Sequence, residues 1–229
     1  MYRAIFFDRD ETLTYNDQSD INIRDQKIKE WSGHPFVLTY EKFIDTFKRT
    51  KMLRESFKNI KSLEEEKIFF SEFIKLLLIN EGITEKIDEK AKILTKNLWF
   101  FERKLFPETM GVLEYFNKNG YEMGVISDTD ITLEETLKNV GIAKYFKSFT
   151  SSAEVGVSKP DPRIFNAALD KHNVKADECI YIDDYDAAVN SARELGFTSF
   201  LINRDLKNKE KWKIKNLKEI IEYVEKGKW

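Results

Sequence analysis

The stretch that decides the fold reads Ala4-Ile5-Phe6-Phe7-Asp8-Arg9-Asp10-Glu11-Thr12-Leu13-Thr14. Four apolar residues in a row, followed at once by charged ones, predict a strand that is buried on both faces of a sheet. Side chains two positions apart on a strand point the same way, so Asp8 and Asp10 are aimed together where the strand ends. Paired acids also occur in turns and helix caps, so this pair indicates a site only if other groups converge on it.

The composition of the chain excludes several classes of protein. With 229 residues, of which 41% are hydrophobic, the chain can bury a core, and disorder is not expected. The formal net charge of -2 argues against a nucleic-acid partner bound through overall charge. The longest strongly apolar run, residues 74–79, is interrupted by Lys75 and falls far short of the roughly 20 residues that a membrane-spanning helix needs.

Two further features bear on where the protein works. Cys179 is the single cysteine, so no intramolecular disulfide can form, which fits a reducing compartment. Met1-Tyr2-Arg3 leads directly into the first predicted strand, with no signal peptide before it. We therefore expect a cytoplasmic protein without a membrane partner.

Beyond Thr14 the pattern of the sequence changes. Residues 15–25 are polar and irregular, and over residues 40–106 the apolar positions recur at near-helical spacing. From Pro107 onward helical patterns alternate with short apolar runs, which predict strands at residues 121–126, 149–151, 179–182 and 198–202. Such alternation predicts a mainly parallel sheet with right-handed crossovers.

The predicted fold class is therefore α/β. We expect a Rossmann-like parallel-sheet core with helices on both faces, formed by residues 1–14 and 107–229. Residues 15–106 are expected to form an inserted, all-helical cap domain.

Polar groups follow each of the first four predicted strands. In chain order they are Asp8 and Asp10, then Ser127 and Asp128, then Lys159 after a loop, then Asp183 and Asp184. Because ligands bind beyond the carboxyl ends of parallel strands, we expect these groups to share one edge of the sheet. Each alone is explained by a cap or a solvated loop, but together they predict a functional site.

The residue types point to metal-assisted phosphate chemistry. Asp8, Asp183 and Asp184 offer the hard oxygen ligands that suit Mg²⁺, and clustered carboxylates need a dication or Lys159 to balance their charge. A phosphate monoester fits such a site, with Ser127 and backbone N–H groups holding its non-bridging oxygens.

Two acids divide the chemistry between them. Asp8 can attack phosphorus and form an aspartyl-phosphate. Asp10 can protonate the leaving oxygen and then take a proton from the attacking water. That role predicts a higher pKa for Asp10 than for Asp8.

At this point the sequence resembles the haloacid dehalogenase superfamily of hydrolases. Residues 8–14 are similar to its first motif, Ser127 to the second, and Lys159-Pro160 to the third. Residues 181–184, with the run at 192–197, look like the fourth.

The resemblance assigns roles to the same residues. It implies that Asp8 is the nucleophile and Asp10 the acid/base, and that Ser127, Asp128 and Lys159 bind phosphate. It also implies Mg²⁺ held by Asp8, the Asp10 backbone carbonyl and Asp184, with Asp183 bound directly or through water. A helical cap over the substrate is implied as well.

Asp10 separates the reaction types of that superfamily. Members that cleave carbon–halogen bonds lack this second aspartate, so its presence favours a phosphatase acting on a small phosphorylated metabolite. Phosphomutases keep the residue and are the enzyme alternative. A non-catalytic phosphate-binding or regulatory module is the alternative from another class, which the intact set of residues disfavours.

Several features of the sequence have two interpretations each. Arg9 stands where the superfamily usually has an apolar residue, and it either reaches toward the substrate or points away. Trp31, His34 and Arg54 are candidate substrate contacts in the cap, each with a structural or solvent-facing role as the alternative. A monomer and a homodimer are both compatible with the sequence.

Overall fold

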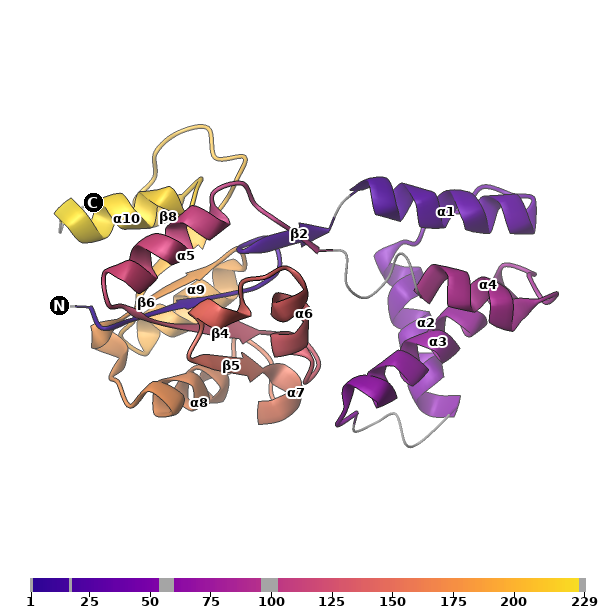
Figure 1. Cartoon of the computed structure of the whole chain (residues 1–229), viewed down its shortest axis with the longest axis horizontal. Coiled ribbons are helices and arrows are strands. Elements are labelled where there is room, and N and C mark those ends of the chain that lie inside the picture. Colours follow the sequence, from indigo (N-terminus) through magenta and orange to yellow (C-terminus); the bar gives the residue numbers. More distant parts are fainter. Residues whose placement is uncertain (1, 17, 54–59, 96–102, 227–229) are drawn as a thin grey trace. The chain divides into compact units, whose positions relative to one another are not determined.

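The computed structural model describes residues 2–16, 18–53, 60–95 and 103–226. The chain divides into two compact units, one formed by Met1–Tyr15 with Arg103–Trp229 and the other by Asn16–Glu102. Each unit has its own hydrophobic core. The first unit carries the sheet and the second carries helices (Figure 1).

The first unit is built on a six-stranded sheet with the strand order β5-β4-β1-β6-β7-β8 and parallel pairing throughout. The strands are β1 (Ala4–Phe7), β4 (Glu122–Ser127), β5 (Ser148–Ser151), β6 (Cys179–Asp183), β7 (Thr198–Ile202) and β8 (Lys213–Ile214). The strand β1 lies between β4 and β6, with Phe7 paired to Val125 and Ile182. Asp8 therefore follows a strand inside the sheet, with a neighbouring strand on each side.

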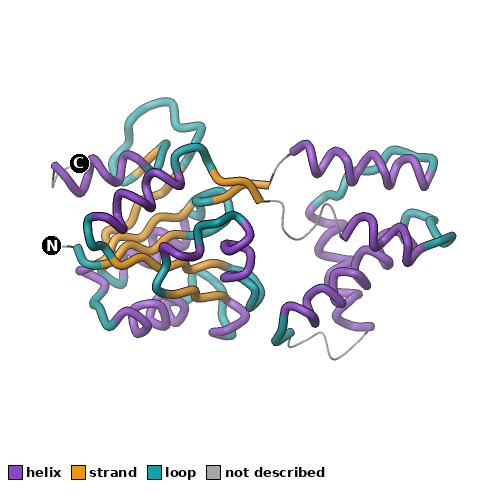
Figure 2. The backbone as a smooth tube through the Cα atoms, viewed as in Figure 1, coloured by secondary structure: helices purple, strands orange, loops and turns teal. Residues whose placement is uncertain are grey.

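Helices cover both faces of this sheet, as the sequence predicted (Figures 1 and 2). One face packs against α5 (Thr109–Lys118), α6 (Leu133–Asn139) and α10 (Lys218–Lys226), and the other against α8 (Pro162–His172) and α9 (Asp186–Glu194). Ile5 and Phe7 belong to the first cluster, and Ala4 and Phe6 to the second. All four side chains are fully buried, so the apolar run of β1 joins the two halves of the core.

The structure adds elements that the sequence pattern did not indicate. The strands β2 (Thr14–Asn16) and β3 (Arg103–Leu105) form a separate two-stranded ribbon (Figure 2), and β8 extends the main sheet. Strands of two or three residues are too short to show an alternation of apolar and polar positions. The smaller elements are α7 (Ser152–Val155) and the single 3₁₀ turns η3 (Ala143–Tyr145) and η4 (Ala176–Glu178).

In the second unit the described elements are α1 (Gln18–Ser32), α2 (Tyr40–Leu53), α3 (Leu63–Asn80) and α4 (Ile87–Leu94). The helix α1 occupies most of the stretch that was expected to be irregular. Its polar sequence carries only a weak apolar stripe, so the sequence pattern did not indicate a helix there. Phe69, Phe73 and Leu77, four residues apart along α3, form the centre of the core. Leu53 and Ile68, expected in the apolar stripes, are exposed.

None of the helices in the described ranges is both long and apolar enough to cross a lipid bilayer.

His172 is a buried polar residue of α8, and it couples the stability of the first unit to pH. Its imidazole lies 2.7 Å from Ser148 Oγ and 3.0 Å from Glu122 Oε2, and it meets the ring of Phe6 edge-on. Burial lowers the pKa of His172 below 6.5, with Lys147 and Lys171 acting in the same direction and Glu122 opposing them. The folded state therefore favours the neutral ring.

This environment predicts a stability that falls in mild acid. Because the folded pKa lies below the unfolded one, stabilisation is full above about pH 6.5 and declines as the pH falls below it. Denaturant unfolding between pH 7.5 and pH 5 measures this loss, and His172→Gln should reduce the pH slope while costing about 1–3 kcal/mol at pH 7.5. An unchanged slope in the variant would assign the pH dependence to other groups.

Candidate active site

Three carboxylates meet where β1 and β6 end. Asp8, Asp183 and Asp184 each offer one oxygen, and these atoms all lie within 4.8 Å of one another. Asp8 and Asp183 are buried, whereas Asp184 is exposed. The backbone N–H of Asp8 donates to the carbonyl of Ile182 over 2.9 Å, which ties the two strand ends together. The donors are oxygens only, the set that suits Mg²⁺.

Lys159, in the loop before α8, offsets part of the negative charge of this cluster. Its ammonium lies 2.6 Å from Asp8 Oδ1 and 2.8 Å from Asp183 Oδ2, and only 8% of the residue is exposed. Asp128, at the end of β4, accepts a hydrogen bond from the Lys159 backbone N–H at 2.9 Å. Asp128 thus fixes the segment that carries the ammonium, and we infer a positioning role for it.

Tyr181 belongs to the same cluster, although the strand and motif that contain it did not predict a role for its hydroxyl. Its hydroxyl donates to Asp183 Oδ2, the oxygen that also accepts from Lys159. The backbone N–H of Tyr185 donates to the other oxygen of Asp183 at 2.8 Å. The available signal was spacing, because residues 181 and 183 share one face of β6.

The environment shifts the pKa values of these groups. Burial raises the pKa of Asp8 to about 7, against the opposing effect of Lys159. Burial, together with the charge of Asp183, raises the pKa of Asp184 to about 6. Burial acts to lower the pKa of Lys159, but Asp8 and Asp183 outweigh it and raise that pKa. A dication among these oxygens would favour the ionised carboxylates.

Asp10 is held by two arginines, which corrects one expectation. Arg9 Nη2 lies 2.8 Å from its Oδ2, and Arg103 Nε lies 2.7 Å from its Oδ1. Burial acts to raise the pKa of Asp10, but Arg9 and Arg103 hold it well below its usual range. The expected order, with the pKa of Asp10 above that of Asp8, is therefore wrong for this structure.

The same contacts settle the orientation of Arg9. It is 3% exposed and turns toward Asp10, with further hydrogen bonds to Thr129 and Thr136. Arg103 was missed, because 93 positions separate it from Asp10 and its surroundings in the sequence show no motif.

The remaining candidates lie in different places. Ser127 is buried at the end of β4, and β4 pairs in parallel with β1, the strand that Asp8 follows. In the second unit Trp31 packs against the helical core, and His34 lies on the surface 3.7 Å from Glu81. Arg54 lies outside the described residues.

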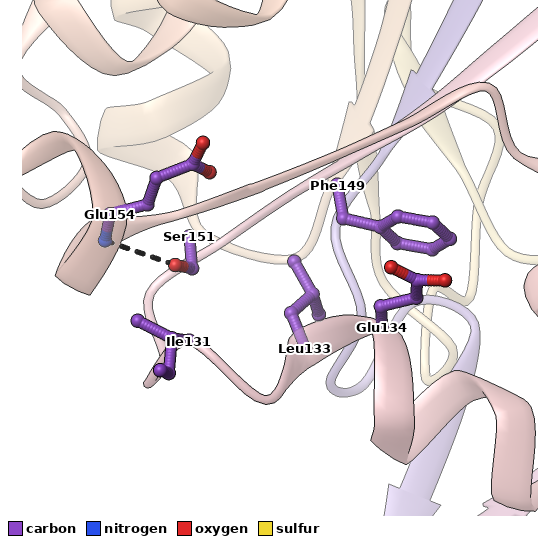
Figure 3. A pocket seen from close by; sticks show the side chains of 6 residues that line it. All are labelled: Ile131, Leu133, Glu134, Phe149, Ser151 and Glu154. Carbon is purple, nitrogen blue, oxygen red and sulfur yellow. Dashed lines mark hydrogen bonds between the residues drawn. The ribbon is translucent and has the colours of Figure 1, made fainter. Parts of the chain in front are cut away.

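A hollow of about 260 Å³ opens beside the edge strand β5 (Figure 3), and its lining includes none of the three acids. Ile131, Leu133 and Phe149 give it an apolar wall, and Glu134 and Glu154 lie at its rim. Ser151 accepts the backbone N–H of Glu154 there, as a cap of α7. None of the predicted site residues lines this hollow, so we do not assign it to the site.

A comparison with protein families decides what this arrangement belongs to. Residues 2–196 match the model of the haloacid dehalogenase-like hydrolases. The chain belongs to this family. The match confirms the resemblance carried by the four sequence motifs and identifies the chain as a hydrolase of this family.

Two relatives show which proteins this haloacid dehalogenase-like hydrolase is similar to in sequence. A glyceraldehyde 3-phosphate phosphatase from Methanocaldococcus jannaschii is 25% identical over 98% of this chain and 97% of its own. Haloacid dehalogenase-like hydrolase domain-containing protein 3 from Danio rerio is 31% identical, over 44% of this chain and 42% of that protein.

Solved structures support the fold. A 2-haloacid dehalogenase from Pseudomonas syringae superposes with a TM-score of 0.67 at 20% identity, covering 99% of this chain and 100% of that one. At this identity the likeness concerns the fold alone.

The buried ion pairs of Lys159 predict a large cost of its removal. Lys159→Met leaves Asp8 and Asp183 buried without their cation, so the free energy of unfolding should fall by about 3–5 kcal/mol in the presence of a chelator. Lys138→Met, which removes an exposed ammonium paired with Glu134 and Glu135, should leave the free energy of unfolding almost unchanged, because exposed ion pairs contribute little. Urea unfolding measures both, and equal costs would contradict the central role of Lys159.

Proposed function

We propose that this protein is a Mg²⁺-dependent phosphatase that hydrolyses a small phosphorylated metabolite through an aspartyl-phosphate on Asp8. The observation that carries the proposal is the buried Asp8–Lys159–Asp183 cluster with Asp10 two residues from Asp8. Such a site places a carboxylate nucleophile next to cationic charge, which a phosphate monoester needs in order to bind and react.

In the first step an oxygen of Asp8 attacks phosphorus. A bond between that oxygen and phosphorus forms, the ester bond breaks, and the leaving oxygen takes a proton from Asp10. The ammonium of Lys159, 2.6 Å from Asp8, offsets the negative charge that gathers around phosphorus. Ser127 and the edge of the sheet around Asp128 supply further phosphate contacts in this proposal.

In the second step Asp10 takes a proton from water. The water oxygen then attacks phosphorus, the bond to Asp8 breaks, and inorganic phosphate is released. Both steps use the same two acids, and Asp10 is restored at the end. Its hydrogen bonds to the two arginines must change for this role.

The oxygen donors fit a Mg²⁺ ion held by Asp8, Asp184 and the Asp10 backbone carbonyl. Both oxygens of Asp183 already accept hydrogen bonds from protein groups, which favours contact through water for this residue. When bound, the ion neutralises the carboxylates and polarises the phosphoryl group.

The named relatives support the phosphatase assignment. The M. jannaschii protein, named a glyceraldehyde 3-phosphate phosphatase, matches this chain over nearly its full length. In the proposal the helical unit at residues 16–102 acts as the cap that selects the substrate. A cytoplasmic location is part of the same proposal, supported by the single cysteine, Cys179, which is free and buried in β6.

Removal of the nucleophile tests the proposal directly. Asp8→Asn keeps the shape of the side chain but loses the attacking oxygen, so 4-nitrophenyl phosphate hydrolysis with Mg²⁺ should fall by about 10³-fold or more. Asp170→Asn makes the same change at an exposed acid of α8 and should keep full activity.

Product analysis separates the alternatives. A screen of phosphate esters should release inorganic phosphate from the substrates that the wild type accepts. An isomerised ester without free phosphate would identify a mutase instead. A wild type as inert as Asp8→Asn throughout the screen would point to a non-catalytic module.

Metal affinity provides a separate test of the site. Asp184→Asn should weaken Mg²⁺ binding by at least about 10-fold in titration calorimetry, since even outer partners of a metal site have effects of that size. Asp186→Asn is the matched control two residues on, where the carboxylate accepts from the Asn190 amide. Equal affinities of the two variants would place the ion elsewhere.

A further inference from the structure

Asp10 accepts an unusual number of charged donors. From Arg9, Nε lies 3.2 Å from Oδ1 and Nη2 lies 2.8 Å from Oδ2. From Arg103, Nε lies 2.7 Å from Oδ1 and Nη2 lies 3.3 Å from Oδ2. Each carboxylate oxygen therefore accepts one hydrogen bond from each guanidinium.

Although 40% of the Asp10 side chain is exposed, its hydrogen-bonding capacity is taken up by the two arginines. A carboxylate has about four lone-pair sites, and two forked guanidiniums occupy all of them. An acid/base residue needs at least one of these sites for the proton that it exchanges with the leaving oxygen or with water. One guanidinium must therefore move away from Asp10 before either step can occur.

Arg9 is held in place by contacts other than those with Asp10. It is 3% exposed, and its guanidinium also donates to Thr136 Oγ1 and Thr129 Oγ1, each at 3.1 Å. Both anchors are themselves held. Thr136 donates to the carbonyl of Leu133 at 2.7 Å, and the Thr129 carbonyl accepts from Ser152 Oγ and Ala153 N, each at 3.2 Å.

The anchors lie in the first unit, where Thr136 is buried and Thr129 is half-buried. Thr129 lies in the segment between β4 and α6, and the wall of the hollow in Figure 3 is formed by Ile131 of the same segment and Leu133 of α6. Rotation of Arg9 away from Asp10 would leave a buried guanidinium without its ionic partner, which is strongly unfavourable.

Arg103 is placed differently. It begins the three-residue strand β3, and 17% of its side chain is exposed. Within the described part of the chain, its guanidinium donates to Asp10 alone. Among those residues, no acceptors like the two threonines of Arg9 bind the Arg103 guanidinium. Its departure would therefore break only its hydrogen bonds to Asp10.

We propose that the two guanidiniums have different tasks: Arg9 is a positioning residue that holds Asp10 throughout the reaction, whereas Arg103 covers the working side of Asp10 and is displaced by substrate. The inference rests on the proposed function, because it concerns the acid/base role of Asp10. The proposal also assigns a role to Arg9, which stands where the family usually has an apolar residue.

The test compares two matched variants, Arg9→Leu and Arg103→Leu, each of which removes one guanidinium from the same carboxylate. The readout is kcat/KM for 2,4-dinitrophenyl phosphate and for phenyl phosphate, with Mg²⁺ present. The first leaving group departs without a proton and the second benefits from one, so the ratio of the two values reports proton transfer from Asp10. Because kcat/KM ends at phosphoenzyme formation, the later hydrolysis step does not affect it.

We expect Arg9→Leu to lower kcat/KM for phenyl phosphate by about 10-fold or more beyond any change with the dinitrophenyl ester, as expected for partial loss of a general acid. Arg103→Leu should leave that ratio unchanged or shift it toward phenyl phosphate. Equal changes of the ratio in both variants, or no change in Arg9→Leu, would overturn the division of tasks.

Controls keep the outcome interpretable. Arg9→Lys keeps the charge without the fork and should give an intermediate ratio, which serves if Arg9→Leu does not fold. Ser148→Ala loses the hydrogen bond to His172 in the sheet core, so it lowers stability away from Asp10 and should not move the ratio. Failure of the proposed function would appear separately, as a wild type inert toward both esters.

Discussion

The candidate active site depends on one buried ammonium. Lys159 lies between Asp8 and Asp183, and all three residues are buried, so its removal would leave two like charges facing each other at the end of the sheet. The parallel sheet brings these residues together, since β1 and β6 are neighbours and the loop before α8 reaches the same edge. Asp128 then joins β4 to this arrangement by accepting the Lys159 backbone N–H.

Much of this was predictable from the sequence, for a clear reason. The apolar run at residues 4–7 and the acids after it form a local pattern, and parallel topology places the groups after each strand at one edge. Asp8, Asp183 and Asp184 accordingly meet, with Lys159 among them. The helices on both faces followed from the alternation of patterns beyond residue 107.

What the sequence did not indicate depends on contacts between distant side chains. Arg103 reaches Asp10 across 93 positions, from a strand too short to be recognised. Tyr181 was placed in a predicted strand and in the fourth motif without a role of its own, although its hydroxyl donates to Asp183. The predicted order of the pKa values of Asp8 and Asp10 was wrong because each pKa depends on the groups around the acid. Asp8 lies in a buried cluster with Lys159, whereas Asp10 is bound by two guanidiniums. Such partners become visible only in three dimensions.

The buried contacts of Arg9 also constrain how this sequence can change. Arg9 is buried and donates hydrogen bonds to Thr129 and to the buried Thr136. Replacing Arg9 alone by a hydrophobic residue would leave two hydroxyls facing a side chain that cannot bond to them, and replacing the threonines alone would deprive the guanidinium of its acceptors. The three positions are therefore expected to vary together among descendants of this chain. A lineage passing from this arrangement to the apolar residue usual at position 9 would have to cross a less stable intermediate, which makes the exchange rare once Arg9 is established.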